Sequence, residues 1–186
     1  MEAIARAIQE RRLDASIEIV VSSNPNAEGL KRAEFLGIKT RVFEQNAFPS
    51  KIEYENAIIQ TLHEHNVGLV LLAGYMKILG VELIQAFRHH VMNIHPSLLP
   101  AFKGLHAQRQ AVEYGARYSG CTVHFVTEDL DGGPIILQDT VEVSPEDTEK
   151  SLSDKILEKE HVLYPRAVQL FAENRLKIEN KRVVIL

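Results

Sequence analysis

Asn93 and His95 stand two positions apart at the end of an apolar segment, and two prolines follow closely. Residues two apart on a strand point the same way, because successive side chains alternate between its faces. An amide donor beside an imidazole suits the binding of an oxygen that becomes negative during a reaction. The fixed φ angles of Pro96 and Pro100 favour one geometry for such a loop. A turn role for the Asn and a packing role for the His remain open.

Asp131 precedes two glycines and a proline in the segment DLDGGP. Asp-Gly pairs are strong turn formers, so a plain turn carries equal weight on local grounds. A carboxylate near His95 would instead favour the imidazolium and orient the ring. Together, Asn93, His95 and Asp131 would suit attack by an amine on a carbonyl carbon. The donors would stabilise the oxyanion, and the His–Asp pair would move the proton that the amine loses.

The other histidines give weaker signals. His63 and His65 lack the HExxH spacing that places two zinc ligands on one helix face, and a solvated helix surface is the better interpretation. His89 and His90 are typical of a charged helix end. Two further histidines are open between packing and support of the substrate site: His106 and His124. With a single cysteine and no spaced ligand cluster, no metal site is expected.

Length and composition favour one domain over residues 1–186. A formal net charge of −4 gives no global attraction for nucleic acid or an anionic membrane surface. The single cysteine precludes an internal disulfide, which suits a reducing compartment. No run approaches the roughly 20 apolar residues of a membrane helix, and the first residues lack the apolar stretch of a signal peptide. We expect a cytoplasmic protein.

Apolar periodicity and turn residues predict alternating helices and strands. Helices are expected over 2–11, 26–38, 50–66, 78–90, 107–115 and 147–173, with Ser50 as an N-cap. Strands are expected over 17–23, 39–44, 67–74, 91–95, 120–127 and 134–143, with a two-stranded tail over 175–186. The strand over 67–74 is apolar on both faces, as is typical of a strand buried between helical layers. The alternation predicts an open α/β sheet, mostly parallel, with helices on both faces.

Ligands of such sheets bind beyond the carboxyl ends of the strands, where several loops converge. Three segments with unusual residues follow predicted strands: 74–79, 93–100 and 127–133. We therefore expect these segments to meet around a single site.

Two segments, NIHPSLLPAFKGLH from Asn93 and HFVTEDLDGGPIILQ from His124, resemble the phosphoribosylglycinamide formyltransferases, folate-dependent enzymes of purine biosynthesis. The resemblance extends over residues 1–177. It implies a Rossmann-like formyltransferase fold and transfer of the formyl group of 10-formyltetrahydrofolate to the amine of glycinamide ribonucleotide. It places the catalytic residues of the family on Asn93, His95 and Asp131.

The resemblance also implies where both substrates bind. The folate would contact the YMKIL segment, the 127–131 loop and a basic residue near its glutamate tail: Lys51, Met76, Lys77, Ile78, Leu79, Asn93, Thr127 and Glu128. The nucleotide substrate would contact Gly74, Pro96 and Glu160. Many relatives carry Arg at the two lysine positions, and a Lys offers a point charge in place of a bidentate fork. The expected partners are these two small molecules, and the sequence is compatible with a homodimer.

The sequence departs from the family at its beginning. Family members begin with a strand and a glycine-rich loop whose amides hold the substrate phosphate at a helix N-terminus. This sequence begins inside the helix that follows that loop. We expect a slot of roughly 10 Å between the strands near residues 17 and 69, with unpaired backbone groups on both sides. The sequence would then be an incomplete rendering of the natural chain, with weak phosphate binding and poor stability as it stands.

Other activities remain as alternatives. Methionyl-tRNA formyltransferases and formyltetrahydrofolate hydrolases share the three catalytic residues. The former carry a basic C-terminal extension and the latter an N-terminal regulatory domain, and this sequence shows neither. A catalytically silent folate-binding module would fit the missing phosphate loop, whereas the intact catalytic residues argue against it. The KGLHAQ segment resembles the glycinamide branch.

Overall fold

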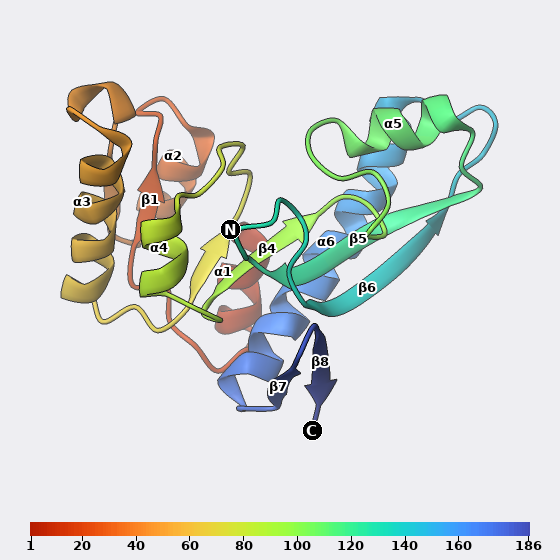
Figure 1. The fold of residues 1–186 in the computed structure, drawn as a ribbon. Coiled ribbons are helices and arrows are strands. Elements are labelled where there is room, and N and C mark those ends of the chain that lie inside the picture. Colours follow the sequence, from red (N-terminus) through yellow and green to blue (C-terminus); the bar gives the residue numbers. More distant parts are fainter.

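The computed structural model describes residues 1–186, and the helices and strands expected from the sequence are present, most of them shorter than expected (Figure 1). The first half contains α1 (Glu2–Gln9), β1 (Val20–Ser22), α2 (Glu28–Phe35), β2 (Thr40–Val42), a 3₁₀ helix (Gln45–Ala47), α3 (Lys51–Glu64), β3 (Val70–Leu72) and α4 (Val81–Ala86). The second half contains β4 (Val91–His95), α5 (Ala107–Tyr114), β5 (Tyr118–Phe125), β6 (Ile135–Glu142), α6 (Glu149–Ala172), β7 (Leu176–Glu179) and β8 (Arg182–Ile185).

Helices cover both faces of the sheet, as the sequence predicts. On one face, Ile156 of α6 packs in a cluster with Met92 of β4, and α1 contributes to the same cluster. On the other face, Ile58 of α3 and Leu83 of α4 pack in a second cluster with Val91. Neighbouring residues of β4 therefore face opposite layers, as the pleat of a strand requires. No helix carries the long apolar stretch needed to cross a bilayer.

The strand pairing is parallel in the first half of the chain. β1 pairs with β2, and β3 pairs with β4, both in parallel. β4 then pairs with β5, and β5 with β6, in antiparallel fashion. β7 and β8 form the expected antiparallel tail. The predicted parallel α/β architecture is thus confirmed up to His95, and the sheet continues with two antiparallel strands.

β1 and β3 lie between the same two helical layers without pairing with each other. Val21 of β1 and Leu72 of β3 pack against the same cluster, yet their strands belong to separate sheets. Every residue of these two strands remains partly exposed. The expected lack of pairing between these two strands is confirmed. β3 is also less buried than its apolar sequence predicts, because one of its edges has no neighbouring strand.

A buried carboxylate joins α3 to the segment before α4. Glu55 is 1% exposed, and its Oε1 accepts a hydrogen bond of 2.6 Å from the Gly80 N–H. Its Oε2 has no hydrogen-bond partner. Glu55 therefore fixes the end of the segment that the family resemblance assigns to folate binding.

At the start of α3, the Ser50 hydroxyl accepts a hydrogen bond from the Glu53 N–H at 3.2 Å, which confirms the predicted N-cap.

We expect Gly80→Ala to destabilise the fold. The added Cβ would collide with the Glu55 carboxylate, which has no room to retreat because it is buried. Overpacking of this kind costs about 2 kcal/mol, measurable as a lower free energy of unfolding in urea. The control is Gly29→Ala in α2, where a Cβ meets nothing within 4 Å. That change should be neutral or slightly stabilising. Equal effects of the two substitutions would contradict the prediction.

Candidate active site

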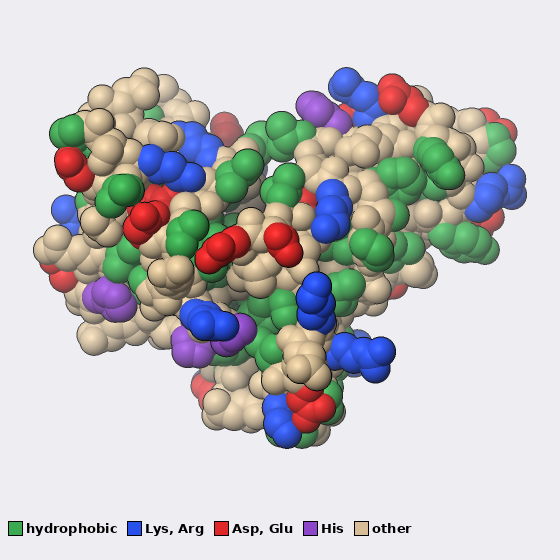
Figure 2. Space-filling model, viewed as in Figure 1, with side chains coloured by type: hydrophobic (Ala, Val, Ile, Leu, Met, Phe, Trp, Pro, Cys, Tyr) green, Lys and Arg blue, Asp and Glu red, His purple; other side chains and the backbone are tan.

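Three loops meet at a hollow between two lobes of the molecule. Figure 2 shows this hollow between the lobe of α2, α3 and α4 and the lobe that carries α5. The segments around it follow β3, follow β4 and connect β5 to β6. These are the three segments that the sequence singled out.

The β5–β6 loop reaches the site by a route that the sequence did not predict. β5 is antiparallel to β4, with Met92 opposite Phe125 and His95 opposite Thr122. The carboxyl end of β5 therefore lies beside the start of β4, and the expectation of three shared carboxyl ends is wrong for this loop. The loop instead folds back across β4. A Cβ on Gly133 would collide with the Phe125 carbonyl oxygen, so this close return requires glycine.

His95 and Asp131 lie side by side in the buried part of the hollow. The imidazole Nδ1 is 3.4 Å from Asp131 Oδ2, and the two side chains are 6% and 9% exposed. On its other side, His95 Nε2 lies 2.8 Å from the carbonyl oxygen of Phe102. Asp131 Oδ2 also accepts a 2.8 Å hydrogen bond from the Gly104 N–H. Both imidazole nitrogens thus face oxygen acceptors, which hold the ring in one orientation.

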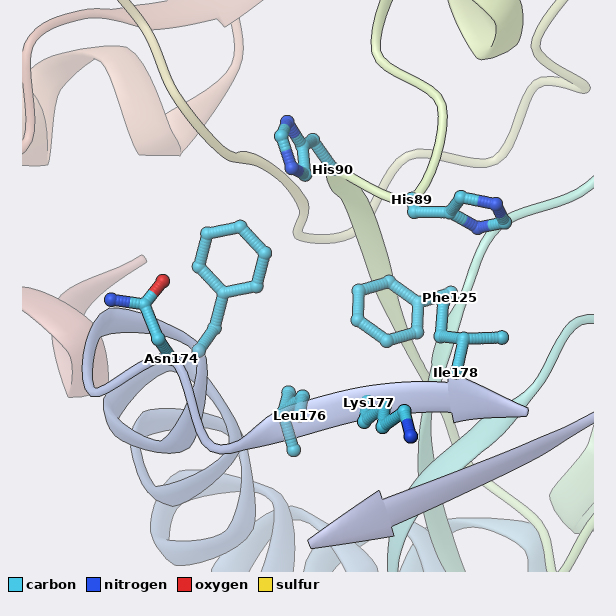
Figure 3. Close-up of a pocket in the computed structure, with 8 residues that line it drawn as sticks. His89, His90, Phe125, Asn174, Leu176, Lys177 and Ile178 are labelled. Atoms are coloured by element: carbon cyan, nitrogen blue, oxygen red, sulfur yellow. The ribbon is translucent and has the colours of Figure 1, made fainter. Parts of the chain in front are cut away.

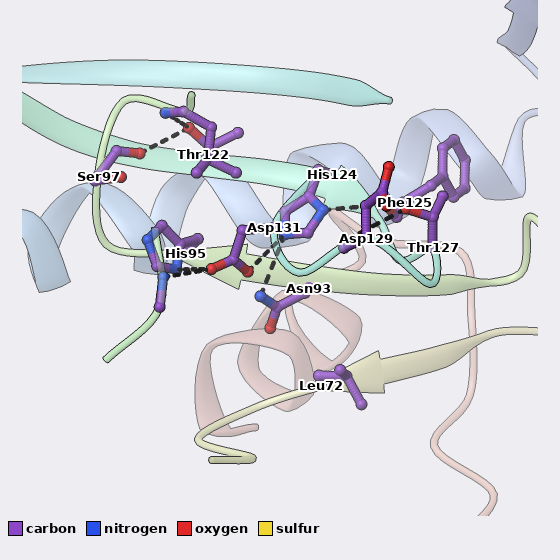
Figure 4. A network of polar contacts seen from close by, with 12 residues as sticks. Leu72, Asn93, His95, Ser97, Thr122, His124, Phe125, Thr127, Asp129 and Asp131 are labelled. Atoms are coloured by element: carbon purple, nitrogen blue, oxygen red, sulfur yellow. Dashed lines mark hydrogen bonds and ion pairs between the residues drawn. The ribbon is translucent and has the colours of Figure 1, made fainter. Parts of the chain in front are cut away.

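His124 orients Asn93 as a neutral ring (Figure 4). Its Nδ1 lies 3.0 Å from the Phe125 carbonyl oxygen, and its Nε2 lies 3.3 Å from Asn93 Nδ2. Nδ1 therefore carries the proton, and Nε2 accepts from the amide. Burial lowers the pKa of His124, against the raising effect of its hydrogen bond to Phe125. Its 3.8 Å separation from Asp131 Oδ1 is accordingly not an ion pair.

The two histidines left open by the sequence have different places. His124 is 2% exposed and belongs to the cluster around Asp131. His106 is 61% exposed at the rim, 3.4 Å from Glu149, which also pairs with Arg109 at 2.9 Å. These contacts tie the loop after β4 to the start of α6. His106 thus has no contact with the catalytic candidates.

The segment after β3 exposes two apolar side chains. Met76 and Ile78 are 81% and 65% exposed, whereas Leu79 packs against the cluster covered by α3 and α4. Lys77 turns away to Gln45, with a 3.2 Å hydrogen bond. Met76 and Ile78 are therefore the two exposed apolar side chains of this segment.

Lys51 contacts this same segment. Its Nζ donates a 3.1 Å hydrogen bond to the Ile78 carbonyl oxygen and lies 3.8 Å from Glu55 Oε1. Its side chain is still 47% exposed.

Thr127 and Glu128 lie on the β5–β6 loop. The 3.5 Å contact from Thr127 Oγ1 to the Asp129 carbonyl oxygen is too long to restrain this loop strongly.

The three predicted nucleotide contacts come from three elements. Gly74 turns the chain after β3 with a φ of 67°, and Pro96 follows β4 directly. Glu160 lies on α6, where burial raises the pKa of its carboxyl to about 7. No hydrogen bond compensates this burial. An unpaired, partly buried carboxylate of this kind is common where a ligand supplies the missing donor.

The sequence missed the main-chain groups that hold His95 and Asp131. The Phe102 carbonyl and the Gly104 N–H both belong to the FKGLH segment, residues 102–106, but backbone groups leave no trace in residue type. A separate pocket of about 360 Å³ lies beside the amino end of β4, lined by His89, His90, Phe125, Phe171, Asn174, Leu176, Lys177 and Ile178 (Figure 3). It contains none of the predicted site residues.

Comparison with known proteins places the chain in a family. The formyl transferase family profile matches residues 1–168. Phosphoribosylglycinamide formyltransferase of Bacillus subtilis is 41% identical over 168 residues, which cover 90% of this chain and 86% of the relative. The human trifunctional purine biosynthetic protein adenosine-3 is 41% identical over 184 residues, and the chain spans 18% of that longer protein.

Comparison of the fold with solved structures leads to the same family. The crystal structure of glycinamide ribonucleotide transformylase 1 from Symbiobacterium toebii superposes with a TM-score of 0.98 at 46% identity. The match covers 100% of this chain and 87% of that one. Sequence and structure therefore agree that this chain belongs to the formyl transferase family.

Proposed function

We propose that this protein transfers the formyl group of 10-formyltetrahydrofolate to the amine of glycinamide ribonucleotide. The observation that carries the proposal is the meeting of Asn93, His95 and Asp131 in one hollow, from a strand and a distant loop. Relatives of similar length named phosphoribosylglycinamide formyltransferase support the choice of substrates. Formylated glycinamide ribonucleotide and tetrahydrofolate would be the products.

The side chains supply what attack of an amine on a formyl carbon needs. The second N–H of Asn93 and the Nδ1–H of His95 would donate to the formyl oxygen as it gains negative charge. Nδ1 is the available ring donor, because its 3.4 Å separation from Asp131 exceeds a good hydrogen-bond length whereas Nε2 is bonded to Phe102. Asp131 would orient the His95 ring so that this donor faces the formyl oxygen. The amine loses one proton and the departing folate nitrogen gains one. Asp131, acting through water, is the group placed to carry that proton.

The hollow also suits both substrates. The exposed side chains of Met76 and Ile78 would offer an apolar surface to a flat pterin ring. We propose that Leu79, Lys77, Thr127 and Glu128 shape this folate site from behind and from the facing loop. Lys51 would meet the folate glutamate tail with the exposed part of its ammonium. Gly74, Pro96 and Glu160 would contact the nucleotide, with the Glu160 carboxylate accepting from its hydroxyl or amine groups.

The fate of a labelled formyl group tests the proposal. The protein would be mixed with 10-[¹³C]formyltetrahydrofolate and glycinamide ribonucleotide, and the products followed by NMR. We expect the label to appear as an amide on the glycine nitrogen. Label released as formate, with or without the amine, would indicate a hydrolase. Label that stays on the folate would indicate a silent folate-binding module. Either result would contradict the proposal.

We expect the stability of the protein to depend on the charge of Glu160. The carboxyl has an ordinary pKa of 4.5 when unfolded and about 7 when folded. Between these values the unfolded chain binds fewer protons, so the free energy of unfolding falls as pH rises from about 4.5 to 7. Glu160→Gln removes this fall in the free energy of unfolding, because the amide does not ionise. It should stabilise the protein by about 2 kcal/mol at pH 8 and have little effect at pH 4.

Urea unfolding at the two pH values measures this difference. Glu158→Gln, an exposed change on the same helix, is the matched control and should have the same small effect at both. A stabilisation by Glu160→Gln that is equal at pH 4 and pH 8 would contradict the prediction.

In the transfer assay, Glu160→Gln should raise KM for the nucleotide more than it lowers kcat.

A further inference from the structure

The loop over residues 102–105 holds both members of the His–Asp pair by its main chain. The Phe102 carbonyl lies 2.8 Å from His95 Nε2, and the Gly104 N–H donates to Asp131 at 2.8 Å. A shift of this loop would therefore move both catalytic groups together. The backbone is strained at Phe102, where φ is 51°, whereas the φ of 78° at Gly104 is one that glycine adopts freely. A non-glycine residue at positive φ needs surroundings that hold it there.

Gln110 supplies contacts that hold this loop. Its side-chain Nε2 donates to the Lys103 carbonyl at 3.2 Å and to the Leu105 carbonyl at 3.0 Å. These two carbonyls flank Gly104, whose N–H binds Asp131. A primary amide has two N–H donors, so one Gln can satisfy both carbonyls. The reversed amide would point its oxygen at two other oxygens, which fixes the orientation seen here.

The helix that carries Gln110 is itself firmly anchored. Ala107 and Ala111 of α5 are fully buried. On the exposed side, Arg109 pairs with Glu149 of α6 at 2.9 Å. The Gln110 amide is thus presented from a rigid element, as accurate positioning of a site requires.

We propose that Gln110 is a positioning residue for the formyl transfer. It fixes the 102–105 loop so that Phe102 and Gly104 orient the His95 imidazole and the Asp131 carboxylate. Gln110 acts through the loop, because its amide is bonded to the Lys103 and Leu105 carbonyls. The kinetic consequence rests on the proposed function, whereas the geometric consequence at His95 does not.

Two substitutions with similar volume separate the hydrogen bonds from packing. Gln110→Met keeps the bulk and removes both donors, and Gln110→Glu places acceptor oxygens against the two carbonyls. Gln108→Met makes the same chemical change two residues away, where the side chain forms no hydrogen bond. We expect Gln110→Met to lower kcat about tenfold or more with KM for both substrates nearly unchanged, because small misplacements of catalytic groups are costly. Gln110→Glu should lower kcat further than Gln110→Met does. Gln108→Met should leave kcat unchanged.

A spectroscopic readout tests the geometry without turnover. In ¹H–¹⁵N spectra selective for histidine, the His95 Nε2–H should be shielded from exchange by its bond to Phe102. We expect this signal to shift and exchange faster in Gln110→Met and Gln110→Glu, while melting temperatures show that all variants stay folded. An unchanged His95 signal together with unchanged kcat would overturn the proposal.

The two proposals fail in different ways. A wild-type protein without transfer activity would contradict the proposed function, and the His95 spectra alone would then decide the role of Gln110. A loss of kcat that is matched by an equal loss in Gln108→Met, with the His95 signal unmoved, would indicate a general effect on α5. That result would also overturn the positioning role.

Discussion

His95→Ala is expected to lower kcat by about 10³-fold with little change in KM for either substrate, because it would remove an N–H donor whose bond to the formyl oxygen strengthens only as that oxygen gains charge. The imidazole is nearly buried and lies between the Phe102 carbonyl and Asp131, so no neighbouring side chain can replace it. Steady-state transfer kinetics with both substrates varied would measure the effect.

The matched control for that experiment is His63→Ala, at an exposed position in the last turn of α3. It should retain wild-type kcat. A loss below about tenfold in His95→Ala, equivalent to 1.4 kcal/mol in the barrier, would exclude His95 as a principal catalytic group.

Asp131→Asn is expected to lower kcat by about 10²-fold or more, because the proposed proton carrier beside the His95 ring is lost. The new amide also carries a donor where Asp131 Oδ1 now faces His124 Nε2 at 3.8 Å. That donor would compete with Asn93 for the same ring nitrogen. The substitution therefore disturbs both halves of the site while it keeps the size of the side chain.

Asp129→Asn is the control for this prediction. It lies two residues away on the same loop, and its side chain forms no hydrogen bond or ion pair. Its kcat should stay near that of the wild type. If Asp131→Asn were as active as Asp129→Asn at every pH between 6 and 9, the carboxylate would have no role in the chemistry.

The sequence predicted the parts of the fold that depend on local residue patterns. The helix that starts at Ser50 has a cap, and the strand over Val91 to His95 has its predicted bounds, because both follow from residue types within a few positions. The two motifs around Asn93 and Asp131 likewise predicted the side chains that meet in the hollow. The gap between β1 and β3 could also be expected, from comparison of the sequence with its relatives.

The remaining features depend on contacts between distant segments. The antiparallel direction of β5 reverses the end at which its loop emerges, and alternation of strands and helices does not encode that direction. Nor does residue type reveal that Lys51 bonds to the Ile78 carbonyl, or that Glu55 is buried against Gly80. The hold of Gln110 on two carbonyls is invisible for the same reason, because main-chain partners look alike in every sequence.

The most direct test of the central claim is a crystal structure of the protein with glycinamide ribonucleotide and a stable 10-formyl folate analogue. We expect the formyl oxygen to lie within about 3 Å of both the Asn93 amide nitrogen and a nitrogen of the His95 ring. Asp131 should remain beside that ring. A formyl oxygen bound away from both donors, with His95 and Asp131 still in contact, would contradict the account.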